Sequence, residues 1–349
     1  MITTKDFYYE LPEGLIAQEP ADPRDSSKLM VLDRADGNIK HSVFTSIIDH
    51  LNPGDILVLN DTKVIPVKIF AHKITEGRSG AKIELLLYKN IKGNIWETMI
   101  KNTRRLRPGI SINIDGSNID AKILDKTMEG NVILEFPIDI KSLLHEIGEI
   151  PLPPYVKKIE DRGRRTEISE RYQTIFAKND GAAAAPTAGL HFTQTLLEKI
   201  KTKGVHIAYI TLHTSLGTFL PVREEDLSKH KIFEEYFEIS EGSAEQINRI
   251  KDNGGKVIAC GTTVVRALET NSKKDGRVDA GRGATSLFIY PPYEFKMVDH
   301  MITNFHLPCS TLLMLVSALA GKENIFKAYQ EAIRKKYRFY SFGDAMAII

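Results

Sequence analysis

The segment KVIACGTTVVRALET, residues 256–270, decides how the chain folds. Its apolar first part, Lys256–Cys260, predicts a short buried strand, and Thr263–Thr270 predicts the helix that follows at once. A strand that passes directly into a helix is the building unit of α/β sheets, where ligands bind beyond the carboxyl ends of the strands. Free N–H groups, hydroxyls and a guanidinium at this junction suit a carboxylate or phosphate, although an N-capping threonine beside a surface arginine is the structural alternative. The candidate anion-binding residues are Gly261, Thr262, Thr263 and Arg266.

Strands and helices alternate on both sides of this segment. Helices are predicted over Thr193–Lys203, from a capping box at Ser243–Gln246 to Gly254, and from Ser310 to Gly321. Strands are predicted over Val205–Leu212 and Thr285–Tyr290. The order predicts an α/β domain in which a mostly parallel sheet is flanked by helices.

Residues 64–150 have a different pattern, in which short strand-like runs are separated by Gly and Asn/Asp turns. Such a series predicts a small antiparallel β-barrel inserted into the α/β domain. We therefore expect the first part of the α/β domain at 1–63, the barrel at 64–150 and the second part of the α/β domain at 151–349. The predicted barrel strands are Val64–Ala71, Lys82–Tyr88, Ile95–Ile100, Ile110–Ile114, Ile119–Leu124 and Val132–Phe136.

The composition excludes several classes of protein. The 349 residues carry a net charge of +2, which is too balanced for a protein that holds nucleic acid through bulk charge. The two cysteines, Cys260 and Cys309, have no zinc-site spacing, so we expect no metal. The longest apolar run, Leu312–Ala320, is far short of the ~20 residues that span a bilayer. No signal peptide pattern is visible, and we expect a cytoplasmic protein without a membrane segment.

Three histidines lie in motifs that follow predicted strands or turns. His191 ends the small-residue loop that contains Thr187 and Gly189, where a ligand can approach the backbone closely. His213 follows the strand over 205–212, and His306 lies in Thr-Asn-Phe-His-Leu-Pro at 303–308. Histidine titrates near neutral pH, so these residues are candidates for proton transfer, with Asp61 or Asp344 as the next candidate base. The structural alternative is that all three histidines only hold loops in place.

Other catalytic and nucleotide-binding signatures are missing from the sequence. There is no GxSxG nucleophile elbow, P-loop or GxGxxG fingerprint. Local basic clusters are present, and clustered Lys and Arg are typical of surfaces that contact phosphates. The highly charged segment Val156–Arg171 is expected to be a mobile loop that can become ordered on a ligand. The basic residues are Lys101, Arg104, Arg105 and Arg107, then Arg162, Arg164 and Arg165, and finally Arg334, Lys335, Lys336 and Arg338.

Together the motifs resemble the S-adenosylmethionine:tRNA ribosyltransferase-isomerase family of queuosine biosynthesis, and the resemblance runs nearly end to end. The matching segments are Leu15–Gln18, Arg24–Ser26, Gly54–Asp55, Leu59–Thr62, Pro151–Tyr155, Tyr172–Thr174, Ala185–Phe192, Thr211–His213, Gly217–Phe219, Gly261–Thr263, Thr303–Pro308, Tyr337–Phe339 and Gly343–Met346.

The resemblance implies an α/β domain with an inserted β-barrel and an unusual use of S-adenosylmethionine. The family transfers and isomerises its ribosyl moiety onto 7-aminomethyl-7-deazaguanine at the tRNA wobble position, giving epoxyqueuosine-tRNA, adenine and methionine. S-adenosylmethionine is then the co-substrate, no metal is needed, and we expect a monomer. The expected catalytic residues are His191, His213, His306 and Asp61. Those expected to bind S-adenosylmethionine are Thr187, Gly189, Gly261, Thr262, Thr263 and Arg266. Those expected to bind tRNA are Lys101, Arg104, Arg105, Arg107, Arg334 and Lys335.

The sequence departs from the family pattern at a few positions. Thr214-Ser215 stands where Val-Gly is usual, and Phe233 stands where a histidine is common. Lysine replaces the usual arginine at Lys28 and Lys68, which keeps the charge but loses the bidentate fork. Pro292 stands where glycine is usual.

Two other classes remain as alternatives. A non-catalytic RNA-binding protein would use the barrel and the basic clusters, but it would leave the Gly- and His-rich motifs unexplained. An S-adenosylmethionine-dependent RNA methyltransferase is the other, although the glycine-rich loop expected after its first strand is missing.

Overall fold

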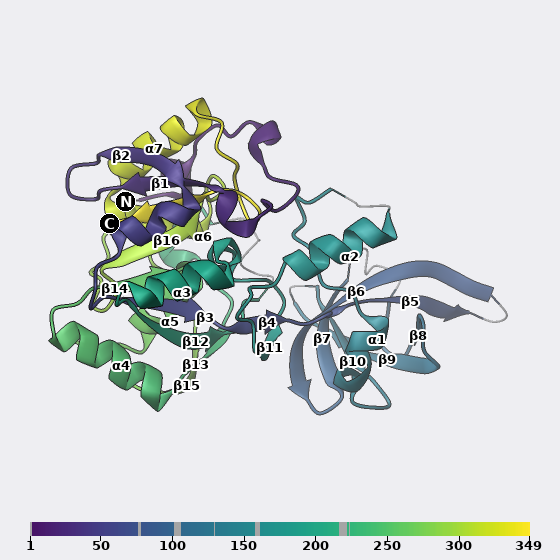
Figure 1. The fold of residues 1–349 in the computed structure, drawn as a ribbon. Helices are drawn as coiled ribbons and strands as arrows, with labels where there is room; N and C mark the ends of the chain where they lie inside the picture. Colours follow the sequence, from purple (N-terminus) through teal and green to yellow (C-terminus); the bar gives the residue numbers. More distant parts are fainter. Residues whose placement is uncertain are drawn as a thin grey trace. The chain divides into compact units, whose positions relative to one another are not determined.

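The chain folds into two compact units, one formed by Met1–Lys63 with Pro153–Ile349 and one by Val64–Leu152. The computed structural model describes residues 2–75, 78–100, 106–128, 130–157, 161–215, 222 and 224–349. Figure 1 shows both units as ribbons.

The first unit is built on a nine-stranded sheet with the order β15-β13-β12-β3-β14-β16-β17-β1-β2. In that order the strands are β15 (Gly281–Thr285), β13 (Glu235–Ile239), β12 (His206–Leu212), β3 (Ile56–Asn60), β14 (Val257–Cys260), β16 (His300–Asn304), β17 (Ala345–Ile348), β1 (Lys28–Leu32) and β2 (Ile39–Val43). Separately, β4 (Thr62–Val64) pairs with β11 (Asn179–Ala182).

The parallel part of the sheet is its centre. Strands β12, β3, β14 and β16 are mutually parallel, and β17 is parallel to β1. The pairs β12–β13, β13–β15, β16–β17 and β1–β2 are antiparallel, so the sheet as a whole is mixed. Strand β2 returns to β1 through a short turn at Gly37, and a short turn can join only antiparallel neighbours. The predicted α/β class with parallel strands is thus confirmed, with antiparallel strands added toward the edges.

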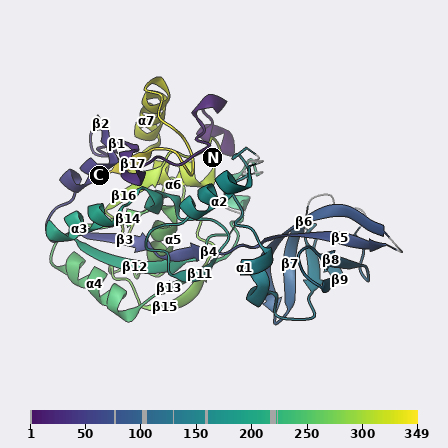
Figure 2. The same ribbon diagram turned by 45° about the vertical axis from the view of Figure 1, so that its right-hand side comes forward.

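Helices and a 3₁₀ segment cover the two faces of this sheet (Figure 2). In β3, Ile56 and Val58 pack into one apolar core and Leu57 and Leu59 into the other, because successive side chains of a strand point to opposite faces. The first core contains side chains of α4 (Glu241–Asp252), α5 (Thr262–Thr270), α6 (Thr311–Ala320) and α7 (Lys322–Arg334). The second contains side chains of α3 (Gln194–Thr202) and η4 (Phe44–His50).

Three local predictions differ from the structure. Helix α4 begins at Glu241 rather than at the predicted capping box, because the Ser240 hydroxyl accepts the Ser243 N–H and caps the helix. Strand β15 ends at Thr285, where the strand over 285–290 was predicted to begin. Within the segment predicted as a loop, α2 (Arg162–Arg171) is helical, since the Asp161 carboxylate accepts the Arg164 N–H as an N-cap.

The second unit is a closed antiparallel barrel, as predicted, with the order β10-β7-β6-β5-β8-β9. Alternate residues such as Ile112, Ile114, Ala121 and Ile123 are buried, as a filled barrel interior requires. A short helix, α1 (Leu144–Ile147), precedes the end of the unit at Leu152. The strands are β5 (Lys68–Thr75), β6 (Arg78–Lys92), β7 (Ile95–Ile100), β8 (Ser111–Ile114), β9 (Ile119–Lys126) and β10 (Val132–Glu135). Across both units, no helix among the described residues is long and apolar enough to cross a membrane.

Candidate functional site

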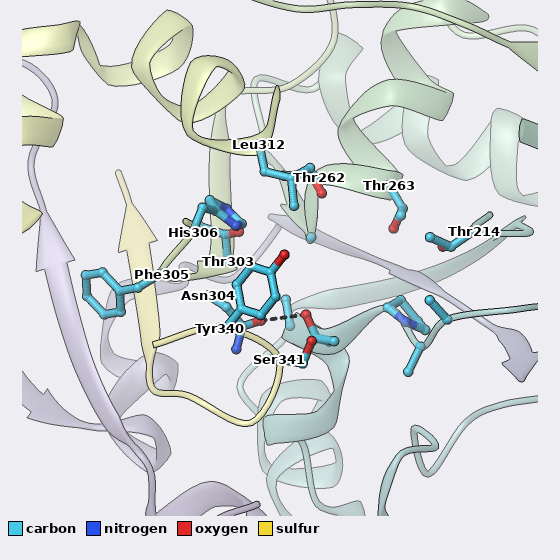
Figure 3. Close-up of a pocket in the computed structure, with 16 residues that line it drawn as sticks. Thr214, Thr262, Thr263, Thr303, Asn304, Phe305, His306, Leu312, Tyr340 and Ser341 are labelled. Carbon is cyan, nitrogen blue, oxygen red and sulfur yellow. Dashed lines mark hydrogen bonds between the residues drawn. The ribbon is translucent and has the colours of Figure 1, made fainter. Parts of the chain in front are cut away.

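A pocket lies beyond the carboxyl ends of the central parallel strands (Figure 3). The pocket is partly open to solvent, and the space between its lining residues is about 530 Å³ with that open solvent included. Thr214 follows β12, Gly261 follows β14, and Thr303–His306 spans the end of β16 and the two residues after it, so the sheet topology brings three of the sequence motifs together. The lining residues are Ala184–Ala188, Thr214, Gly261–Thr263, Thr303–His306, Leu312, Tyr340 and Ser341.

The amino end of α5 forms one wall of this pocket. Gly261 has φ of 92°, in the left-handed region that favours glycine, and turns the chain sharply from β14 into the helix. No side chain of the described part of the chain caps the helix, and its first backbone hydrogen bond is donated by Val265 to the Gly261 carbonyl. The N–H groups of Thr262 and Thr263 precede that bond, so this wall offers hydrogen-bond donors and the positive end of a helix dipole.

Threonine hydroxyls continue this wall. Thr214 is 4% exposed, and its hydroxyl has no hydrogen-bond partner among the described residues. Asn60, the last residue of β3, donates to the Thr263 hydroxyl at 3.2 Å and to the Leu212 carbonyl at 3.0 Å. Asn60 therefore links the ends of β3 and β12 to the first turn of α5.

Arg266 is not available to an external anion in this arrangement. Its guanidinium forms a buried ion pair with Glu235 of β13, and it also donates to the carbonyls of Leu287 (3.1 Å) and Thr285 (3.3 Å). The two side chains are 6% and 1% exposed. Arg266 thus packs α5 against the edge strands with its charge already paired, and its role in ligand binding stays a prediction.

His306 is the predicted histidine that lines the pocket. Its Nε2 lies 2.9 Å from the Thr303 hydroxyl, and Tyr329 and Tyr9 hold its backbone N–H and carbonyl. Burial lowers its pKa to about 3, so the ring is neutral near neutral pH. A neutral imidazole can hydrogen-bond a ligand, but it cannot act there as a cationic acid.

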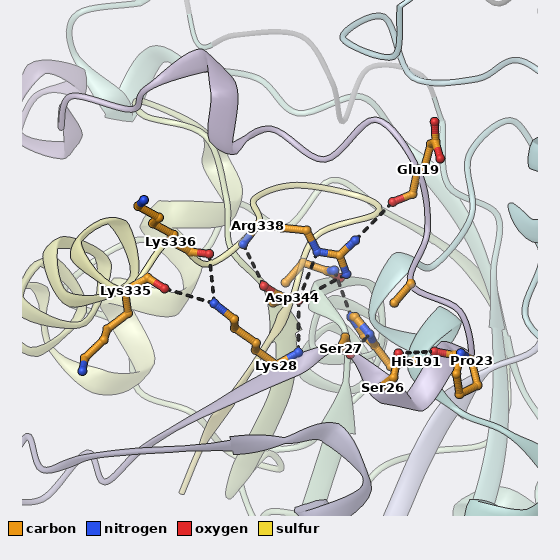
Figure 4. Close-up of polar contacts among 12 residues, drawn as sticks. Glu19, Pro23, Ser26, Ser27, Lys28, His191, Lys335, Lys336, Arg338 and Asp344 are labelled. Carbon is orange, nitrogen blue, oxygen red and sulfur yellow. Dashed lines mark hydrogen bonds and ion pairs between the residues drawn. The ribbon is translucent and has the colours of Figure 1, made fainter.

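His191 lies behind the pocket wall. It ends η7 (Thr187–His191), and its Nδ1 is 2.8 Å from the Ser27 hydroxyl (Figure 4). Its Nε2 is 3.2 Å from the Asn304 amide, whose oxygen accepts the Thr187 hydroxyl at 3.0 Å. Burial, followed by the cationic Arg338 and Arg24, lowers its pKa to about 3. His191 is therefore a neutral ring that orients the pocket residue Asn304.

His213 and Asp61 are outside the pocket lining but beside it. His213 Nδ1 is 2.8 Å from the Thr62 hydroxyl, and the ring is half-buried against Tyr236. Burial lowers the pKa of His213, whereas Asp61, Glu238 and Asp180 raise it in part. The Asp61 carboxylate accepts the Thr211 hydroxyl at 2.6 Å and the Asn179 amide at 3.1 Å.

The other predicted ligand residues have separate positions. Thr187 lines the pocket. Gly189 does not, and a Cβ there would come within 2.9 Å of Phe176 and Thr174. Close packing against these two side chains, rather than the approach of a ligand, accounts for this glycine.

The basic residues are only partly described. Lys101, Arg104 and Arg105, like Gly217–Phe219, lie outside the described residues. Arg107 is exposed in the barrel unit. Arg334 is exposed and pairs with Glu331 at 2.6 Å, and the Lys335 carbonyl accepts the Lys28 ammonium at 3.0 Å (Figure 4). The exposed side chains of Lys335 and Lys336 lie at the end of α7.

Several residues in or beside the pocket were not predicted as site residues. Asn60, Thr303 and Asn304 stood within recognised motifs, so their position at strand ends was the signal for them. Tyr340 and Ser341 come from the segment after α7, for which only the basic residues were predicted to bind a ligand. Among the described residues, no group of three or more His, Cys, Asp or Glu side chains could hold a metal ion.

Comparisons with known proteins agree on one family. The model of the queuosine biosynthesis protein family matches residues 4–348. The chain is 48% identical to S-adenosylmethionine:tRNA ribosyltransferase-isomerase of Clostridioides difficile (strain 630) and 52% identical to that of Sulfurihydrogenibium sp. (strain YO3AOP1), over 99% of each chain. It also resembles the crystal structure of S-adenosylmethionine tRNA ribosyltransferase from Thermotoga maritima, at 38% identity and a TM-score of 0.56, covering 99% of this chain and 100% of that one.

Proposed function

Because the chain belongs to the queuosine biosynthesis protein family, we propose that it is an S-adenosylmethionine:tRNA ribosyltransferase-isomerase. It transfers and isomerises the ribosyl moiety of S-adenosylmethionine onto 7-aminomethyl-7-deazaguanine at the tRNA wobble position, and releases adenine and methionine. The proposal rests on sequence identity: over 99% of its length, the chain shares about half of its residues with enzymes of that name. The pocket at the carboxyl ends of the parallel strands supplies a place for the reaction.

We propose that S-adenosylmethionine binds in this pocket, with its methionine carboxylate at the amino end of α5. The N–H groups of Thr262 and Thr263 and the positive end of the helix dipole favour an anion there. The buried Thr214 hydroxyl supplies a further donor beside them. This placement needs no contribution from Arg266, whose charge is already paired.

The reaction requires a base for the ribosyl methylene that the adjacent sulfonium acidifies, and a donor for the departing adenine. His213 is our candidate for titrating proton transfer, because Asp61 and two other carboxylates counter the effect of burial on its pKa. His306 faces the pocket as a neutral ring and is our candidate for hydrogen-bonding the substrate. His191 acts indirectly, through Asn304.

The tRNA requires a cationic surface. We propose that exposed basic residues at the end of α7, Arg334 and Lys335 among them, contact its phosphates, and that Arg107 of the barrel unit does so as well. A tRNA substrate is also consistent with our proposal that the protein is cytoplasmic. We further propose that the protein is a monomer, which sedimentation analysis of the free chain tests.

The activity is tested with S-adenosylmethionine labelled either in the methyl group or in the ribose, together with tRNA that carries the deazaguanine base. Ribosyl transfer puts the ribose label into tRNA and leaves the methyl label in free methionine. Methyl label in tRNA would indicate a methyltransferase instead. If tRNA binds but neither label moves in single-turnover experiments, the chain is an RNA-binding protein.

The role of His213 has its own control on the same strand. His213→Gln should lower the single-turnover rate by about 100- to 10,000-fold, the usual loss for general acid–base catalysis. His206→Gln, at the exposed start of β12, should keep the rate of the unaltered protein. A normal rate for His213→Gln would remove it from the chemistry, leaving Asp61 as the next candidate.

A further inference from the structure

Tyr340 adopts an unusual backbone conformation for a bulky residue. Its φ is 78°, in the left-handed region that glycine, asparagine and aspartate adopt far more readily. A non-glycine residue held there is strained, and such strain concentrates at ligand-binding sites, where the surrounding structure imposes it. The conformation therefore calls for an explanation in terms of what the side chain does.

Hydrogen bonds on both sides of Tyr340 impose this conformation. Its N–H donates to the carbonyl of Phe305 at 2.9 Å, and its carbonyl accepts the N–H of Gly343 at 2.9 Å. The buried Asp344 carboxylate accepts the N–H groups of Arg338 at 2.7 Å and of Lys28 at 3.1 Å, which closes the base of the loop (Figure 4). The loop over 338–344 is thereby fastened to the ends of β16 and β1.

The ring of Tyr340 is held in one orientation in the pocket. It lines the cavity together with Thr303 and His306 (Figure 3). The ring of Tyr155 meets it edge-on, with centroids 4.0 Å apart and planes at 74°. Tyr340 is only 7% exposed, so the side chain is already ordered before any ligand arrives.

We propose that Tyr340 is a ligand-contacting residue whose ring forms the wall of the pocket against a flat base of the purine type. Aromatic side chains bind such bases by stacking, and a ring that is ordered in advance loses little entropy on binding. The inference rests on the proposed function for the identity of the base. The reaction contains two bases of this chemistry, the adenine of S-adenosylmethionine and the deazaguanine of the tRNA.

Two substitutions test the proposal by distinguishing the effect of the aromatic ring from the effect of an apolar side chain that fills space. Tyr340→Phe keeps the ring, whereas Tyr340→Leu keeps an apolar side chain at the same positive φ but removes the aromatic face. The KM values for S-adenosylmethionine and for tRNA are measured separately for each variant. We expect Phe to stay within about twofold of the unaltered protein and Leu to raise one KM at least about fivefold, the lower end of a base-stacking contribution. The KM that rises identifies which base the ring contacts.

Three further measurements keep the result interpretable. Tyr290→Leu removes a tyrosine that packs on Phe288 away from the pocket lining, and it should change neither KM. If Tyr340→Leu does not fold, Tyr340→Met, with a more adaptable side chain, takes its place. Calorimetric binding of S-adenosylmethionine and of tRNA is measured alongside turnover. If the unaltered protein transfers no ribosyl group but Tyr340→Leu binds S-adenosylmethionine or tRNA more weakly, the role of Tyr340 is supported and the proposed function is refuted. Unchanged KM values and affinities in a folded, active Leu or Met variant would overturn the inference.

Discussion

Replacing Arg266 by methionine distinguishes a packing role for this arginine from a role in binding substrate. Methionine preserves much of the side-chain length but removes the positive charge. The Glu235 side chain, which is only 1% exposed, then has a buried carboxylate without its partner cation. Breaking a buried pair in this way typically costs about 3–5 kcal/mol. At about 2–4 °C per kcal/mol for a unit of this size, the melting temperature should fall by roughly 6–20 °C.

Denaturant unfolding and calorimetry of Arg266→Met measure this loss. The double variant Arg266→Met with Glu235→Gln should recover most of it, because the neutral amide can still accept the Ser215 N–H, which donates to Glu235 at 2.8 Å. Arg282→Met is the matched control on the neighbouring strand, since its pair with Glu238 is exposed and screened by solvent, so the melting temperature should stay nearly unchanged. A variant Arg266→Met with unchanged stability and a raised KM for S-adenosylmethionine would refute the reasoning and return Arg266 to the anion site.

Three further outcomes are expected. Burial lowers the folded-state pKa of His191 and His306 from 6.5 to about 3, so the unfolded chain binds more protons below pH 6.5. Each histidine should therefore lower the free energy of unfolding by about 1.4 kcal/mol per pH unit as the pH falls from 6.5 towards 3. His306→Gln should make this pH dependence shallower, and an unaltered slope would contradict the burial argument. Thr214→Val keeps the shape but removes the unpartnered hydroxyl, so it should raise the KM for S-adenosylmethionine by about 2- to 10-fold, and an unchanged KM would place the carboxylate elsewhere. Arg107→Ala should reduce the salt dependence of tRNA binding by about one unit of log–log slope, whereas an unchanged slope would mean that Arg107 is a solvated side chain.

The sequence by itself determined the class of the fold and the position of the pocket. The apolar run before Gly261 and the helical pattern after it predicted β14 and α5, and six short runs predicted the barrel strands. Strand and helix patterns are local, because periods of two and 3.6 residues are visible in a few neighbouring side chains. The topology rule for parallel sheets then placed the motifs after β12 and β14 at one edge of the sheet. Strand β16, which brings Thr303–His306 to the same edge, was not among the predicted strands.

Only the tertiary structure decided what the individual side chains can do. The sequence predicted Arg266 as a free cation, yet its guanidinium forms an ion pair with Glu235 of β13, a strand that precedes α5 in the chain. His191 was predicted as a base, yet Ser27, just before β1, and Asn304, at the end of β16, hydrogen-bond its buried, neutral ring. The charge state and hydrogen bonding of a group depend on neighbours within a few ångströms, and the packing of distant segments, rather than the local sequence pattern, sets those neighbours.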